Sequence, residues 1–224
     1  MNSRSIAAAD GFSPAAVEDI ASRLLGWFDL SRKYVVALSG GVDSSVVARA
    51  ASLSGASARL VTATSAAVSS SEIRDVEKLC TQLGLPHHFL RTEELSVEGY
   101  VQNAASRCYF CKNELFTQIS ARFPGAVILT GTNLDDLSDY RPGLKAASEH
   151  HVCSPLAELR ISKTGVRALA ALWKLHVADK PASPCLASRI AHGVSVTEER
   201  LGRIESAEAA LRALGLADCR VRLH

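Results

Sequence analysis

Residues 35–47 read V-V-A-L-S-G-G-V-D-S-S-V-V, and this stretch decides the fold of the chain. Residues 34–38 are β-branched, aliphatic or aromatic, and they predict a strand that is buried on both faces. Residues 43–50 predict a helix, with polar residues over its first turn. Between the two, Gly40 and Gly41 allow backbone N–H groups to approach a ligand closely. Because the first N–H groups of a helix have no internal acceptor and its dipole favours anions, the stretch predicts a phosphate site.

The type of phosphate site follows from the residue that faces the turn. A Walker loop would place a lysine on the phosphates, whereas this sequence has Asp43, and the Rossmann glycine pattern is also missing. A carboxylate beside a polyphosphate is repulsive unless a divalent cation bridges them, so magnesium is implied. Ser39, Ser44 and Ser45 add hydroxyl donors. The alternative, an ordinary tight turn, explains the Gly-Gly-Val-Asp-Ser-Ser sequence less well.

The rest of the chain alternates strand and helix patterns. Further strands are predicted at residues 59–63, 87–90 and 126–130, with short strands at 152–153 and 219–223. Helices are predicted to begin at Pro14 and at Thr197, and to cover residues 113–122 and 162–173. Another is predicted to begin at a capping box formed by Ser69 and Glu72 and to end at Gly84. This alternation predicts an α/β fold with a doubly wound parallel sheet. Ligands bind such sheets where the strand order reverses, and we expect that point between the loops at 39–41 and 130–133, which includes Gly131.

The composition limits the class of protein. The chain has 224 residues, of which 47% are hydrophobic, and this is enough to bury a full core. A net charge of +2 with 21% charged residues gives no field that favours a polyanion, so nucleic acid is not expected as a partner. Residues 1–10 lack the apolar core of a signal peptide, and no run of about eighteen apolar residues occurs. We therefore expect a soluble, cytoplasmic protein without a membrane partner, in which the six cysteines stay reduced.

Three cysteines are candidates for metal or sulfur chemistry. Cys108 and Cys111 form a C-x-x-C pair in the long connection before the fourth strand, and Cys185 lies in a later loop. Three thiolates complete neither a four-cysteine zinc site nor a fully ligated [4Fe–4S] cluster, and on a cluster they leave one iron open. A zinc site would need Cys153 or a histidine as its fourth ligand. The alternative for the C-x-x-C pair is a chance pairing of small buried residues. Cys80 and Cys153 are predicted to be core residues.

A carboxylate interrupts the apolar stripe of the last helix. Glu208 falls on that stripe, and because burying an unpaired carboxylate is costly we expect it to meet a cation, a metal or an arginine of a neighbouring subunit. Arg220 and Arg222 alternate along the predicted final strand, so their side chains point to one face. They could pair with Glu208 or bind a substrate phosphate. A second interpretation puts Glu208 at the edge of the stripe, paired with Arg212 four residues on.

Further motifs follow the glycine turn in a fixed order. They are C-Y-F-C-K at 108–112, G-T-N-L-D-D at 131–136, D-Y-R-P-G at 139–143, S-P-L-A-E at 154–158 and P-C-L-A-S-R at 184–189. The turn itself, S-G-G-V-D-S at 39–44, resembles the PP-loop of the ATP pyrophosphatase superfamily. Together the motifs resemble the LarE family of ATP-dependent sulfur transferases from about residue 34 to 224. The resemblance implies an adenine nucleotide alpha hydrolase-like domain over residues 1–178. Residues 179–224 would form a small C-terminal appendage that looks truncated, since chains of the family continue further.

The resemblance also implies an activity. Members of the LarE family adenylate a carboxylate of pyridinium-3,5-biscarboxylic acid mononucleotide, release pyrophosphate, and replace the activated oxygen with sulfur. The product is the thiocarboxylate of the nickel-pincer cofactor of lactate racemase. Some members sacrifice the sulfur of one cysteine, and others carry three cysteines and use a [4Fe–4S] cluster. Cys108, Cys111 and Cys185 match the three-cysteine type, so the implied cofactors are ATP, Mg²⁺ and a [4Fe–4S] cluster.

The candidate site residues fall into two sets. The catalytic set, in which the three cysteines are also the metal ligands, is Cys108, Cys111, Cys185, Arg189 and Glu208. The nucleotide- and substrate-binding set is Ser39, Gly40, Gly41, Asp43, Ser44, Gly131, Arg141, Arg220 and Arg222. Arg141 and Arg189 can clamp a phosphate or carboxylate in bidentate fashion, with surface ion pairs as the alternative. Lys112 would lower the pKa of the neighbouring thiols or contact phosphate, unless it is simply solvated.

Two other functions remain open. One is another PP-loop adenylating enzyme, either a tRNA thiolase or an amidating synthase, although the charge shows no basic RNA-binding face. The other is a non-catalytic ATP-binding module, which would have no use for three converging cysteines. For the leading interpretation, the expected partners are a small nucleotide-like substrate, other enzymes of cofactor biosynthesis and a second copy of the chain.

Overall fold

The computed structural model describes residues 12–138, 141–216 and 219–224. The N-terminal stretch 1–10 and the Asp139-Tyr140 part of the D-Y-R-P-G motif lie outside these ranges. The described strands are β1 (Lys33–Ala37), β2 (Ser57–Thr64), β3 (His87–Arg91) and β4 (Val127–Leu129). They form a parallel four-stranded sheet in the order β3-β2-β1-β4. The predicted α/β fold with a parallel sheet is therefore confirmed.

Helices connect the strands. Their bounds are α1 (Pro14–Gly26), α2 (Val42–Ser54), α3 (Ser70–Leu83), α4 (Glu98–Val101), α5 (Arg107–Arg122), α6 (Pro142–Glu149), α7 (Pro155–Glu158), α8 (Lys163–Leu172) and α9 (Glu198–Ala213). Short 3₁₀ helices lie at η1 (Glu94–Ser96), η2 (Asp135–Ser138) and η3 (Leu186–Arg189). The helix starts predicted from capping residues are confirmed, because the side chains of Ser13, Ser69 and Thr197 each accept a hydrogen bond from the first turn that follows.

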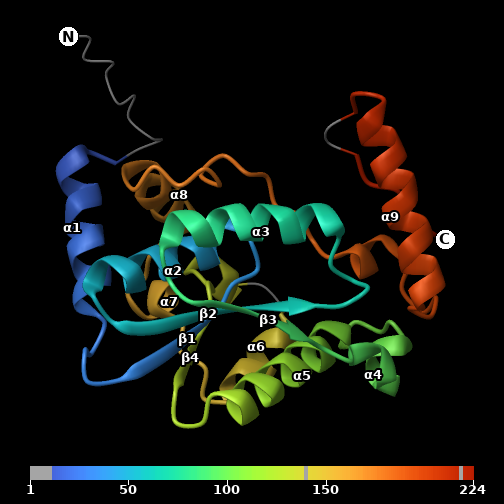
Figure 1. Cartoon of the computed structure of the whole chain (residues 1–224), viewed down its shortest axis with the longest axis horizontal. Helices are drawn as coiled ribbons and strands as arrows, with labels where there is room; N and C mark the ends of the chain where they lie inside the picture. Colours follow the sequence, from blue (N-terminus) through green and yellow to red (C-terminus); the bar gives the residue numbers. More distant parts are fainter. Residues whose placement is uncertain (1–11, 139–140, 217–218) are drawn as a thin grey trace.

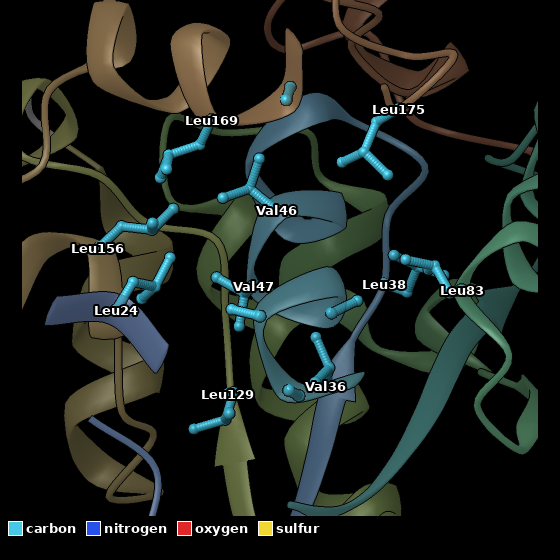
Figure 2. Close-up of a cluster of buried hydrophobic side chains, with 14 of the residues drawn as sticks. Leu24, Val36, Leu38, Val46, Val47, Leu83, Leu129, Leu156, Leu169 and Leu175 are labelled. Carbon is cyan, nitrogen blue, oxygen red and sulfur yellow. The ribbon is translucent and has the colours of Figure 1, made fainter. Parts of the chain in front are cut away.

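Two helical layers cover the sheet. Helices α1, α2, α3 and α8 lie on one side of the strands, and α5 and α6 lie on the other (Figure 1). The alternation along β1 explains both layers. Val36 points into the first layer, in the same buried cluster as Leu24 and Leu169 (Figure 2), whereas Val35 and Ala37 pack against the second. A strand covered on both faces is apolar over its buried length, as β1 is from Tyr34 to Ala37, and Lys33 at its start is exposed.

The sheet has its switch point at β1. The chain leaves β1 for β2 on one side, and β4 pairs with β1 on the other. The loops after β1 and β4 therefore meet at one edge, as predicted from their glycines. Helix α9 lies at the end of the molecule toward which the β2 arrow points (Figure 1). The C-terminal part of the chain is thus placed at the carboxyl edge of the sheet, where ligands of such folds bind.

Three sequence-based placements are wrong. The helix predicted at 113–122 begins six residues earlier, at Arg107, so the C-x-x-C pair of this connection lies on α5. The strand predicted at 152–153 is a single bridge from Cys153 to Leu129, because α7 begins immediately afterwards. The strand predicted at 219–223 is likewise one bridge, from Leu223 to Ile190. Its neighbour leaves η3 at Ile190 and turns again at Gly193, so it offers too little extended backbone for a ladder.

Among the described helices, none combines the length and the apolar character that a membrane crossing requires. The division of the chain into residues 1–178 and 179–224 stays a prediction.

Candidate active site

The glycine turn between β1 and α2 is built as an anion cradle. Gly40 has a φ of 75°, a left-handed conformation that favours glycine, and Gly41 caps α2 without a side-chain hydrogen bond. The N–H groups of the first turn of α2 have no acceptor within the helix and carry its positive dipole end. The hydroxyls of Ser44 and Ser45 donate to the Gly41 carbonyl, at 3.2 and 2.7 Å. These hydroxyls brace the turn, and the backbone supplies the donors for an anion.

Asp43 is held by two side chains that come from other segments of the chain. Asn133 Nδ2 donates to Asp43 Oδ1 at 2.9 Å, and Lys163 Nζ lies 2.5 Å from Asp43 Oδ2. Asn133 follows β4, and Lys163 is the first residue of α8. The three side chains place a carboxylate, an amide and an ammonium group at the N-terminal end of α2. The ammonium group can contact a phosphate, and the carboxylate oxygen is a ligand type that Mg²⁺ prefers.

Gly131 allows the β4 loop to approach this turn. A Cβ atom at that position would lie 2.7 Å from the backbone carbon of Asp43 and 2.8 Å from the Cα atom of Ser44. Neither backbone atom can move aside without displacing the start of α2. The packing of backbone against backbone explains why a glycine stands here, and it confirms that the two glycine-bearing loops meet.

A cavity of about 440 Å³ connects the turn to the cysteine loop. Ser39 of the glycine turn lines it, and so do Cys185 of the cysteine loop and Cys111 of α5. Arg189, Glu208 and Arg220 also contribute to its wall, as do the start of α3 and the loop at 180–185. The structure therefore brings together residues that are far apart in the sequence. In volume the cavity falls within the usual range of small-molecule sites.

The three candidate cysteines differ in exposure. Cys108 and Cys185 are exposed, and Cys111 is partly buried one helical turn after Cys108. Burial raises the pKa of the Cys111 thiol to about 12, although the charge of Lys112 acts in the opposite direction. The prediction that Lys112 would lower this pKa is therefore outweighed by burial. Cys185 is the exposed thiol that lines the cavity.

The cysteines do not form a ready-made metal site. Within residues 12–138, 141–216 and 219–224, no group of three histidine, cysteine or acidic side chains is placed to hold a metal ion. The thiols of Cys108, Cys111 and Cys185 lie near enough to influence one another electrostatically, but they do not converge on one point. These positions of the three thiols do not fit a [4Fe–4S] cluster.

Glu208 meets the cation that its burial requires. It is 1% exposed, its Oε1 accepts from Arg189 Nε at 3.0 Å, and its Oε2 accepts from Arg212 Nη2 at 2.9 Å. The N–H group of Val221 donates to Oε1 as well. Burial would raise the pKa of Glu208, but the hydrogen bonds and charges of the two arginines hold it below its ordinary value. The expected cation is confirmed, and the partner predicted within the helix, Arg212, is one of two.

Arg189 is a structural brace in this arrangement. Its side chain is 6% exposed, and beyond Glu208 it donates to the carbonyl of Cys185 at 3.1 Å and to that of Pro184. Its guanidinium group thus holds the cysteine loop in shape, and its role as a substrate clamp stays a prediction. The alternative that Arg220 or Arg222 pairs with Glu208 is wrong, since Arg189 and Arg212 are its cation partners among the described residues. Arg220 donates instead to the Ala182 carbonyl at 2.9 Å.

The other predicted arginines lie at the edge of the site. Arg220 and Arg222 are both exposed and Val221 between them is partly buried, as expected for side chains that alternate. Arg220 lines the cavity. Arg141 pairs with Asp136 at 2.8 Å in the loop that follows β4. Its role as a phosphate clamp stays a prediction.

Three residues of the site were not predicted as site residues. Asn133 belongs to the G-T-N-L-D-D motif, which does not by itself indicate that this side chain binds Asp43. Lys163 had a usable signal, because a cation at the first position of a helix opposes the helix dipole and so requires a local anion. Lys180 pairs with Glu72 at 2.7 Å and with Asp75 at 3.2 Å, and its loop position gave no such signal.

Known proteins resemble the chain over most of its length. Residues 30–116, which include the glycine turn and the C-x-x-C helix, match the asparagine synthase family. The chain is 42% identical over 192 residues to slr1717, an uncharacterized protein of Synechocystis, covering 84% of this chain and 72% of that protein. It is 27% identical over 210 residues to the uncharacterized protein MJ0830 of Methanocaldococcus jannaschii, covering 86% and 74%.

A third relative decides the family. The chain is 34% identical over 201 residues to pyridinium-3,5-bisthiocarboxylic acid mononucleotide synthase of Lactiplantibacillus plantarum, covering 88% of this chain and 72% of that enzyme. The chain belongs to the LarE family. As a LarE-family protein with a PP-loop domain, it is an ATP-using transferase.

Proposed function

We propose that this LarE-family enzyme converts a carboxylate of pyridinium-3,5-biscarboxylic acid mononucleotide into a thiocarboxylate, for the biosynthesis of the nickel-pincer cofactor. One observation carries the proposal: a single cavity is lined by Ser39 at the glycine turn and by the exposed thiol of Cys185. The Lactiplantibacillus plantarum relative is named for a bisthiocarboxylic acid mononucleotide, which gives the substrate class. An enzyme that activates its substrate with ATP and then transfers sulfur to it needs the phosphate site and the sulfur donor in one cavity.

ATP would bind with its phosphates against the first turn of α2. The backbone N–H groups there supply donors, and Lys163 supplies a positive charge beside Asp43. Asp43 would also hold Mg²⁺ together with phosphate oxygens, and the ion would stabilise the charge on the departing pyrophosphate. The position of Gly131 against the same turn keeps this end of the cavity rigid.

The first chemical step would activate the carboxylate. A substrate carboxylate oxygen attacks the α-phosphorus of ATP, the bond to the β-phosphate oxygen breaks, and pyrophosphate leaves. The product is an acyl-adenylate, whose leaving group is AMP in place of an oxide ion. Because water would hydrolyse this intermediate, the walls of the cavity must exclude it until sulfur arrives.

The second step would use the sulfur of Cys185. The thiolate attacks the acyl carbon, AMP leaves, and a thioester joins the substrate to the protein. Removal of the Cα proton then breaks the Cβ–S bond, which gives the thiocarboxylate and leaves dehydroalanine at position 185. The exposure of Cys185 in the cavity wall supports this route, and Arg189 would hold the loop that carries it.

The three-cysteine route is the second candidate for the sulfur source. It is supported by Cys111 and Cys185, which line one cavity, and by Cys108, which lies one helical turn before Cys111 on α5. It requires the three thiols to move together before they can bind iron. The two routes predict different outcomes for a Cys108→Ser/Cys111→Ser variant. Under the Cys185 route this variant still completes one turnover, and under the cluster route it completes none.

The test is a single-turnover assay on anaerobically purified protein with ATP, Mg²⁺ and the biscarboxylic substrate. We expect AMP, pyrophosphate and thiocarboxylate in equal amounts, together with a dehydroalanine at position 185 in the intact-mass spectrum. The matched variant Cys185→Ser should still catalyse substrate-dependent exchange of pyrophosphate into ATP while forming no thiocarboxylate. Absence of that exchange in the wild-type protein would contradict the adenylation step and favour a non-catalytic ATP-binding module.

A further inference from the structure

Lys180 lies where the cysteine loop passes the start of α3. Its ammonium group pairs with Glu72 Oε2 at 2.7 Å and with Asp75 Oδ2 at 3.2 Å, and its side chain is 17% exposed. All three residues line the cavity that holds Ser39 and Cys185. A lysine with two carboxylates in a partly buried wall is a restrained group, unlike a solvated surface lysine.

The ammonium group of Lys180 also lies over the glycine turn. A Cβ atom built on Gly40 would be 4.0 Å from Lys180 Nζ and 3.5 Å from Glu72 Oε2. The turn that would receive the phosphates therefore faces one positive and one negative group. A polyphosphate entering there is attracted by the ammonium group and repelled by the carboxylate of Glu72. The anion and the carboxylate compete for the same cation.

The backbone of Lys180 belongs to the loop that ends at Cys185. Arg167 donates to the Lys180 carbonyl at 3.4 Å and to the Ala178 carbonyl, which holds the start of the loop on α8. The other end is held where the N–H group of Leu186 donates to the Ala67 carbonyl at 2.9 Å. Between these two attachments, the side chain of Lys180 ties the loop to α3. A change of partner at Lys180 would therefore be transmitted to the segment that carries the thiol.

We propose that Lys180 is a positioning residue that couples occupancy of the phosphate site to the cysteine loop, by exchanging Glu72 and Asp75 for the polyphosphate of ATP. In the nucleotide-free protein the two carboxylates hold it. When ATP binds, the ammonium group turns to the phosphates and draws the loop toward the turn. The inference rests on the proposed function, because it takes ATP as the occupant of the cavity.

The test combines ATP affinity with hydrogen exchange of residues 179–186, using the full-length protein and a non-hydrolysable ATP analogue. In the wild-type protein we expect the analogue to slow exchange in this segment. Lys180→Met should weaken analogue binding by about tenfold, the effect of losing one charge-assisted contact, and should abolish the response of the segment. Lys180→Arg should restore both. Lys78→Met, which removes an exposed charge from α3, is the matched control and should change neither.

A second variant distinguishes partner exchange from a purely structural role, in which Lys180 only attaches the loop to α3. Glu72→Gln with Asp75→Asn removes the competing carboxylates, so partner exchange predicts tighter binding of the analogue by several fold. A purely structural role predicts the opposite, since the loop would lose its attachment just as in Lys180→Met. Weaker or unchanged binding in this double variant overturns the inference and leaves the proposed function standing. Failure of the wild-type protein to bind the analogue overturns both.

Discussion

Two parts of the site are built in different ways: the phosphate end, at the glycine turn, and the sulfur end, at Cys185. At the phosphate end, the glycine turn follows directly from a central strand, and the close approach of Gly131 locks one backbone segment against another. At the sulfur end, Cys185 stands in a loop, and that loop is held by side-chain contacts of Arg189 and Glu208. The first end depends on the sheet, and the second depends on a buried ion pair.

The difference follows from what each end has to do. Under the proposed function, the phosphate end provides donors for an anion, and backbone N–H groups on a rigid element serve this purpose. The sulfur end would have to deliver an atom to the acyl carbon, and a loop supported by charged side chains can move more readily than a strand. Substitutions at the two ends should therefore affect different measurable quantities.

The largest effect is expected from breaking the ion pair at the sulfur end. Glu208→Ala leaves Arg189 buried without a carboxylate, and the free energy of unfolding should fall by about 3–5 kcal/mol in urea titrations. The matched control is Glu199→Ala on the same helix, whose partner Arg203 is exposed, with an expected loss of about 0.5 kcal/mol or less. Equal losses in the two variants would show that the buried pair does not support the loop.

The next effect tests the phosphate end. Gly131→Ala places a Cβ atom against the backbone of Asp43 and Ser44, so it should destabilise the protein by about 1–3 kcal/mol and weaken ATP binding by at least about tenfold. ATP affinity by calorimetry and unfolding in urea are the two measurements. Gly202→Ala, in the exposed face of α9 with no atom near the new Cβ, is the control and should be neutral or slightly stabilising. ATP binding at the wild-type level in Gly131→Ala would contradict the rigid-turn account.

A smaller effect is expected at Lys163. Lys163→Met removes the ammonium group beside Asp43, and ATP binding should weaken by roughly tenfold with little change in the urea midpoint. The ion pair is partly exposed, so its contribution to stability is small. Lys145→Met, which removes an exposed lysine from α6, should leave ATP binding unchanged. A fall in stability without a change in ATP affinity would show that Lys163 serves the fold alone.

The smallest expected effect is a pH dependence at the sulfur end. The two arginines lower the pKa of Glu208 in the folded protein, so the unfolded chain binds the proton more readily. The resulting stability is fully present above the ordinary glutamate pKa and is lost as the pH falls through the lowered one. Urea midpoints of the wild-type protein and of Glu208→Gln should therefore converge at acid pH. A difference between the two urea midpoints that stays constant down to the lowest pH at which the protein folds would contradict this explanation of the pH dependence.

Sequence reasoning reached the phosphate end more completely than the sulfur end. The strand, the turn and the helix start at 35–47 are local patterns, and the meeting with Gly131 follows from the rules of parallel sheets. The C-x-x-C pair was placed correctly in the connection before β4, but the helix there was predicted from residue 113, whereas α5 begins at Arg107. The partner of Glu208 required knowing how a distant 3₁₀ turn folds back, and no local pattern contains that information. Likewise, Lys163 could have been found from its unfavourable place at a helix start, whereas Lys180 could not.

The central claim is that this enzyme forms an acyl-adenylate at the phosphate end before sulfur arrives from the other. The most direct measurement uses substrate with ¹⁸O in its carboxylates, in a single turnover with ATP and Mg²⁺. Attack of the carboxylate on the α-phosphorus predicts that one labelled oxygen appears in AMP when thiocarboxylate forms. Label in phosphate or pyrophosphate, or AMP without label, would contradict the account.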